Sequence, residues 1–194
     1  YKALAWRIVK LIIVAAEPLH LNVVAMLTEH KLCEVKKATS RVSRFFPVDQ
    51  NRKLHSYHKS LADWLTKDDQ KYEGNWYLDL QEEQRLFAQR CLDILKESGI
   101  PGRTISENLD VDLLGLQYAL KYGVTHLCAA GMKDKARSLI LDVAWLVARA
   151  KPEGGGGHAI VLDCERSGET YPAVKRVGRA VGLSLNAIRT DLRQ

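Results

Sequence analysis

Apolar residues recur along the first part of the chain at the three- and four-residue spacing that places them on one face of a helix. Residues 3–16 show this spacing first, and Pro18 ends the pattern. A second apolar stripe runs through residues 19–30, and a third begins at Leu32. The pattern predicts three consecutive helices at the start of the chain.

The segment FFPVDQNRKLHSYH (45–58) then alternates apolar and polar positions on both sides of a polar turn, QNRK. Alternation with a period of two, interrupted by turn residues, predicts a β-hairpin. A helical pattern resumes at Lys59 and includes Trp64 and Leu65. Three helices followed by a hairpin are typical of a winged-helix domain, which we expect over residues 1–67.

Helical spacing returns over most of the remaining chain. The predicted helices cover residues 81–98, 110–122, 124–130, 133–150, 158–166 and 173–192. Between the fourth and fifth of these lies KPEGGGG (151–157), whose run of glycines predicts a hinge. We therefore expect a mainly α chain: a winged-helix domain with a small β-hairpin, a helical bundle over 68–150, and a hinged helical connector over 151–194.

Composition places the chain among ordinary globular proteins. Of its 194 residues, 46% are hydrophobic and 27% are charged. The hydrophobic share is higher than in disordered segments and lower than in membrane proteins. The four cysteines stand singly, so we expect reduced thiols, no metal site and a cytoplasmic location. The chain opens on Tyr1 and its last residues follow a helical pattern, so we expect a segment of a longer polypeptide.

The motifs of the common hydrolases and ATPases are missing from the sequence. There is no Gly-x-Ser-x-Gly elbow and no Gly-x-x-x-x-Gly-Lys-Ser/Thr phosphate loop, and GGGGH (154–158) lacks the Lys-Ser ending of such a loop. His58 and Ser60 stand near each other, but a triad is recognised by geometry and not by proximity in sequence. We therefore assign no catalytic residue and do not expect an enzyme.

Basic residues support a nucleic-acid alternative. The net charge is +6, and the third predicted helix carries Lys36, Lys37, Arg41 and Arg44 away from its apolar stripe. Arg52 and Lys53 stand at the tip of the predicted hairpin. A DNA-binding winged helix would place such side chains on phosphates and guanines, and a solvated basic face is the simpler explanation. The alternative hypothesis is a DNA-binding winged helix with a helical dimerisation region.

A family resemblance rests on three stretches: FFPVDQNRKLHSYHKSLADWL, WYLDLQEEQRLFAQRCLDIL and YALKYGVTHLCAAG. Together they resemble the C-terminal part of the NACHT and NB-ARC families of signal-transduction ATPases with numerous domains (STAND ATPases). The final VKRVGRAVGLSLNAIRTDLRQ resembles the helical run that often precedes a WD-repeat propeller in such proteins. The most specific part of the family resemblance is His58-Lys59-Ser60 followed by Asp63-Trp64-Leu65.

The resemblance implies that His58 contacts the β-phosphate of ADP in an upstream nucleotide-binding domain. An imidazole N–H can donate a hydrogen bond to a phosphate oxygen, so the histidine would act as a latch. ADP or ATP would bind the parent protein, and none would be bound by this segment alone. The expected partners are that upstream domain and a downstream repeat domain, with self-assembly on activation, no membrane and no nucleic acid.

Two positions depart from the family pattern. Lys59 stands where some members carry Asp, so no role is transferred to that position. His20 opens the second predicted helix where a Ser or Thr cap is usual, which predicts a weaker helix cap.

Overall fold

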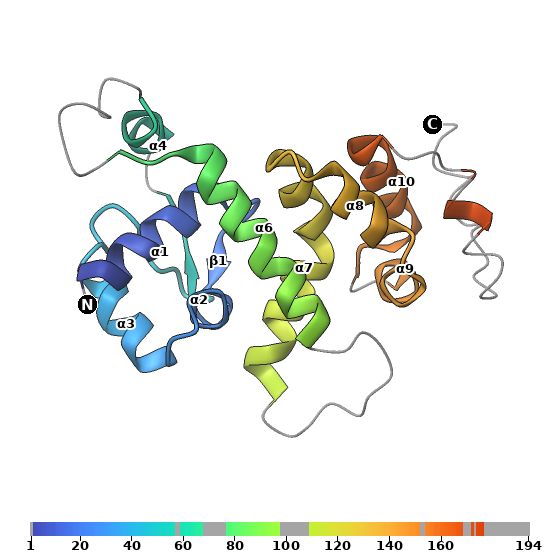
Figure 1. Cartoon of the computed structure of the whole chain (residues 1–194). Coiled ribbons are helices and arrows are strands. Elements are labelled where there is room, and N and C mark those ends of the chain that lie inside the picture. The colour runs from blue at the N-terminus through green and yellow to red at the C-terminus, as the bar shows by residue number, and fades with distance from the viewer. Residues whose placement is uncertain are drawn as a thin grey trace. The chain divides into compact units, whose positions relative to one another are not determined.

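The computed structural model is mainly helical, with one small antiparallel sheet (Figure 1). It describes residues 2–56, 59–67, 77–97, 109–151, 154–168, 172 and 174–176. Compactness divides the chain into two units. Unit 1 comprises residues 1–87 with 110–115, and unit 2 comprises 88–109 with 116–194. The expected domain boundaries after residues 67 and 150 stay predictions.

Unit 1 contains the three helices that the apolar spacing predicts. They are α1 (Lys2–Val14), α2 (Leu21–Thr28) and α3 (Leu32–Ser40). Their buried stripes, which include Ile8, Val24 and Val35, form the core of this unit. Burial of one apolar face in this way accounts for most of the stability of short helices.

The sheet of unit 1 joins two segments that are distant in the sequence. Strand β1 (Leu19–His20) pairs antiparallel with β2 (Lys53–Leu54), with Leu19 opposite Leu54. Val48 forms an isolated antiparallel bridge to Leu54, and this bridge closes the turn of the predicted hairpin. Backbone hydrogen bonds from His55 to Pro47 and from Asp49 to Lys53 join the two arms within the described residues 45–56. The second arm also pairs with β1, a segment for which apolar spacing predicted a helix.

His20 caps α2 although the sequence predicted a weak cap. Its Nδ1 accepts a hydrogen bond from the Asn22 backbone N–H at 3.1 Å. Burial, together with the nearby positive charges of Arg52 and Lys53, lowers the pKa of His20. A lowered pKa keeps the imidazole neutral, and only a neutral ring has a nitrogen that can accept this hydrogen bond.

The remaining helices extend the α architecture. α4 (Lys59–Leu65) belongs to unit 1; α6 (Leu80–Glu97) and α7 (Leu109–Ala129) belong partly to each unit. Unit 2 also contains α8 (Lys133–Ile140), α9 (Val143–Ala150) and α10 (Gly156–Ser167). Only residues 174–176 of the predicted last helix are described, so the prediction for 173–192 lies almost wholly outside the described residues.

Glycine has a packing role in the segment between α9 and α10. Gly154 is buried, and a Cβ there would lie 2.4 Å from the Ala148 carbonyl oxygen and 2.7 Å from the Arg149 Cα. Gly155 and Gly156 both have positive φ, which side chains resist. This gives a reason for the glycines besides flexibility, and the hinge role of 151–157 stays a prediction.

Gly154→Ala should therefore lower the free energy of unfolding by about 1–3 kcal/mol, because backbone atoms must shift to admit the methyl group. Gly123→Ala is the matched control. Its Cβ would meet the Leu95 and Leu139 side chains at ordinary contact distances of 3.6 and 3.8 Å within α7, so helix propensity should raise stability by up to about 1 kcal/mol. Urea titration followed by circular dichroism measures both. Equal effects of the two substitutions would contradict the packing role.

Candidate functional site

The candidate site lies in unit 1, where strand β2 ends and the chain runs toward α4. His58, the predicted phosphate contact, lies outside the described residues, and so does the Lys59 side chain. The residues just before them are described: His55 is half-buried and Ser56 is exposed. The described part of the candidate site therefore consists of β2 and the two residues that follow it.

An Asp-centred turn fixes the end of β2. The Asp49 Oδ1 accepts hydrogen bonds from the backbone N–H groups of Asn51 at 2.8 Å and Lys53 at 2.9 Å. Its Oδ2 lies 2.8 Å from the Nε2 of His55. The hydrogen bond from the Lys53 N–H, followed by the one from His55, holds the pKa of Asp49 below its usual value. The carboxylate thus ties both arms of the turn together and occupies the His55 ring.

The pairing with Asp49 gives His55 a structural role. Its ring joins the residue after β2 to the carboxylate at the start of the same turn. The role of Asp49 was not predicted from the sequence. A local signal was present, since Asp followed by a polar turn commonly accepts backbone hydrogen bonds two residues ahead.

A cavity of about 310 Å³ opens beside the end of β2. Its walls come from the end of α1, the segment that enters β1, and β2 with the two residues after it. Leu19 and Leu54 supply apolar wall, whereas Glu17, His55 and Ser56 supply polar groups. The cavity is lined by Ser56, the last described residue before His58 in the sequence.

The basic residues predicted for nucleic acid are spread over several elements. Lys36 and Lys37 are exposed on α3, which ends at Ser40; Arg41 is its C-terminal cap, and Arg44 lies in the turn beyond. The predicted third helix therefore does not extend to Arg44. Arg52 is exposed at φ 58°, and Lys53 is half-buried in β2 opposite His20. Arg52 and Lys53 both lie near the His20 ring, whose pKa is lowered by burial and by their charges.

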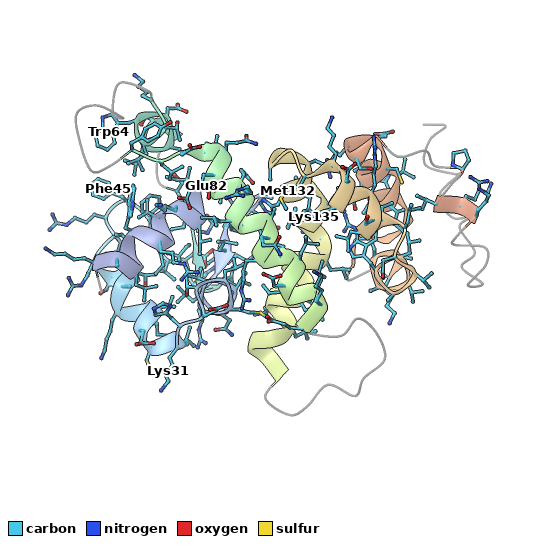
Figure 2. The ribbon with its side chains drawn as sticks, in the orientation of Figure 1. Lys31, Phe45, Trp64, Glu82, Met132 and Lys135 are labelled. Carbon is cyan, nitrogen blue, oxygen red and sulfur yellow. The ribbon has the colours of Figure 1, made fainter. Side chains whose placement is uncertain are left out.

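An exposed aromatic residue adjoins this basic region. Phe45, labelled in Figure 2, follows Arg44 directly and leaves 59% of its surface accessible. Sequence spacing alone did not single it out, because the same residue fits an inward position of a longer strand. An exposed aromatic residue beside cations is suited to stacking on a base or to a protein contact.

The described part of the chain was also compared with the requirements of metal sites, reactive thiols and membrane spans. No group of three or more His, Cys, Asp or Glu side chains suited to a metal ion occurs there. None of the four cysteines, all of which the structure describes, forms a disulfide; Cys91 and Cys164 are buried, Cys128 is half-buried and Cys33 is exposed. Burial raises the pKa of the Cys91 thiol, so it stays protonated and unreactive. None of the described helices has both the length and the apolar character of a membrane span.

Comparison with known proteins identifies no relative: no family model, no curated protein and no solved structure matches this chain.

Proposed function

We propose that this chain is a non-catalytic regulatory module of a STAND-type ATPase switch. In this proposal residues 1–67 form a winged-helix domain that docks on an upstream nucleotide-binding domain while ADP is bound there. His58 donates a hydrogen bond to the β-phosphate, and exchange of ADP for ATP releases the domain. The two arrangements differ in their contacts with nucleotide, which is the requirement for a ligand to shift a conformational equilibrium.

The observation that carries the proposal is the order of elements in unit 1. α1, β1, α2 and α3 are followed by the bridged residue Val48, a turn and β2, and β1 pairs with β2. A winged helix has this order, with a short strand between its first two helices and a hairpin after the third. β2 then leads through the partly exposed residues 55–56 toward His58. The motif that carries the family resemblance, which begins at His58, thus follows β2, the strand expected to present this histidine.

The hydrogen bonds of the described turn are consistent with the proposed latch. Asp49, held by two backbone N–H groups and by His55, constrains the strand end shortly before His58. A phosphate contact needs a positioned donor, because a mobile side chain loses rotamer freedom on binding. A donor that follows a hydrogen-bonded turn would lose less conformational freedom on binding.

His58→Ala in the full-length parent protein should raise spontaneous self-assembly without ligand, because loss of the latch favours the released arrangement. Size-exclusion chromatography with light scattering measures the assembled fraction. His55→Ala is the matched control: it removes a ring of the same hairpin that is paired with Asp49. Spontaneous assembly that rises equally in both variants would point to a damaged hairpin and would contradict the latch.

A second candidate function, DNA binding, is favoured by one observation: Lys36, Lys37, Arg41, Arg44 and Arg52 are all exposed in unit 1. Phosphate contacts by such residues would make the affinity for duplex DNA fall steeply as salt rises. An electrophoretic shift of a labelled duplex at low ionic strength, lost as salt is added and weakened by Arg44→Glu, would favour this function. A duplex that is not shifted at low salt removes it.

A further inference from the structure

A groove in unit 2 runs between α6 and α8 and has a volume of about 460 Å³. We call it the α6–α8 groove; the residues that define its chemistry are Leu92, Leu95, Lys96, Lys135, Leu139 and Asp142. Its volume falls within the range of about 300–1,000 Å³ that is common for small-molecule sites. None of the lining residues belongs to the hairpin of unit 1, so the groove is not part of the proposed switch.

The floor of the groove is apolar and supported from below. Leu92 and Leu95 leave only 8% and 4% of their surface accessible, and Leu139 of α8 is half-buried. Gly123 of α7 lies behind two of them, since a Cβ there would be 3.6 Å from Leu95 and 3.8 Å from Leu139. Contacts on that side hold the leucines in place, so the floor is preformed.

The charged side chains that line the groove sum to a net positive charge. Lys96 and Lys135 contribute two ammonium groups, and Asp142 contributes one carboxylate. The Asp142 Oδ1 already accepts a hydrogen bond from the Trp145 backbone N–H at 2.8 Å, as the cap of α9. Lys135 reaches from α8 to α6, where its Nζ donates to the neutral Gln89 side-chain oxygen at 2.9 Å (Figure 2). Because Gln89 is neutral, this hydrogen bond is not an ion pair.

We propose that the α6–α8 groove binds a single-chain anionic amphiphile, such as a fatty acid of medium length. The aliphatic chain would lie along Leu92, Leu95 and Leu139, and the carboxylate would be held by the ammonium groups of Lys96 and Lys135. Both requirements of such a ligand, apolar area for the chain and cations at the edge, are present in one cavity. A neutral or cationic amphiphile would satisfy only the first.

Isothermal titration calorimetry of the full chain with dodecanoate, below its micelle concentration, tests the proposal. Saturable binding is expected, and dodecylammonium should bind at least tenfold more weakly. The double variant Lys96→Glu/Lys135→Glu should weaken dodecanoate binding at least tenfold. Lys133→Glu, which changes an exposed lysine of α8 that does not line the groove, is the matched control and should leave the affinity unchanged.

A second variant tests the floor without changing charge. Ser138→Phe places a ring at the edge of the groove from an exposed position, so the fold should persist while the chain is displaced. Loss of dodecanoate binding in this variant supports the groove as the site. The proposal is overturned if dodecanoate gives no saturable heat, if dodecylammonium binds equally well, or if either groove variant binds as the wild type does.

Discussion

Arg149→Met should lower the free energy of unfolding by about 3–5 kcal/mol, because it leaves the buried carboxylate of Asp163 without its principal partner. The Arg149 Nε lies 2.8 Å from the Asp163 Oδ2, and the two side chains are 4% and 1% exposed. Arg149 also donates a hydrogen bond to the Gly154 carbonyl oxygen. One guanidinium therefore joins α9, α10 and the glycine segment between them.

The loss should depend on pH with a defined sign. Burial raises the pKa of Asp163, and the Arg149 guanidinium opposes that rise. Without Arg149 the pKa of Asp163 should rise further above its value in the unfolded chain. The cost of burying the charged carboxylate is therefore present above the unfolded pKa, and it shrinks as falling pH protonates the carboxyl. Urea titrations at about pH 7 and about pH 4.5 should therefore give a larger effect at the higher pH.

A double variant separates the ion pair from simple loss of packing. Arg149→Met/Asp163→Leu removes both charges, and it should recover much of the stability lost in Arg149→Met alone. Arg166→Met is the matched control, because this partly exposed arginine lies farther from Asp163, at 3.4 Å, and should cost about 1 kcal/mol or less. Equal losses in the single and double variants would contradict the buried-charge account.

The second large effect concerns the buried histidine of α7. His126 is 2% exposed, and its Nε2 lies 3.0 Å from the hydroxyl oxygen of Tyr118. Burial lowers the pKa of His126 from 6.5 to about 4. The unfolded chain therefore binds a proton at this residue between those two pH values while the folded chain does not.

The contribution of His126 to the free energy of unfolding is thus fully present above about pH 6.5 and is lost as the pH falls toward about 4. The total loss is about 3 kcal/mol. His126→Gln should reduce the difference in free energy of unfolding between pH 7 and pH 4 by about that amount. Urea titrations at the two pH values measure it. His158→Gln, at an exposed position of α10, is the control and should retain the wild-type difference. A wild-type difference that persists in His126→Gln would contradict a buried neutral imidazole.

The sequence predicted the helical class well because apolar spacing reports buried faces directly. Its two main errors concerned where helices break. The predicted helices end before Gly123 and restart after it, but α7 runs through it, because a glycine costs a helix only about 1 kcal/mol and burial of the flanking residues outweighs that. Residues 133–150 were taken as one helix, but Asp142 caps a new helix by accepting from Trp145. Neither tertiary packing nor a side-chain cap within an apolar stripe is visible in periodicity alone.

The candidate site was less predictable than the fold. Alternation over 45–58 located the turn, yet only the structure pairs Leu54 with Leu19, because strand pairing across a long separation leaves no local pattern. The α6–α8 groove likewise combines side chains from helices that are distant in the sequence. The role of His58 still depends on resemblance, and that residue lies outside the described part of the chain.

The rate of ADP dissociation from the full-length parent protein tests the proposed switch most directly. Labelled ADP is loaded, chased with excess unlabelled nucleotide, and followed in the wild type, His58→Ala and His55→Ala. A hydrogen bond to a charged phosphate contributes about 1.5–3 kcal/mol, so His58→Ala should release ADP about tenfold faster or more. His55→Ala should release it at nearly the wild-type rate. Equal release from the wild type and a folded His58→Ala protein would contradict the latch.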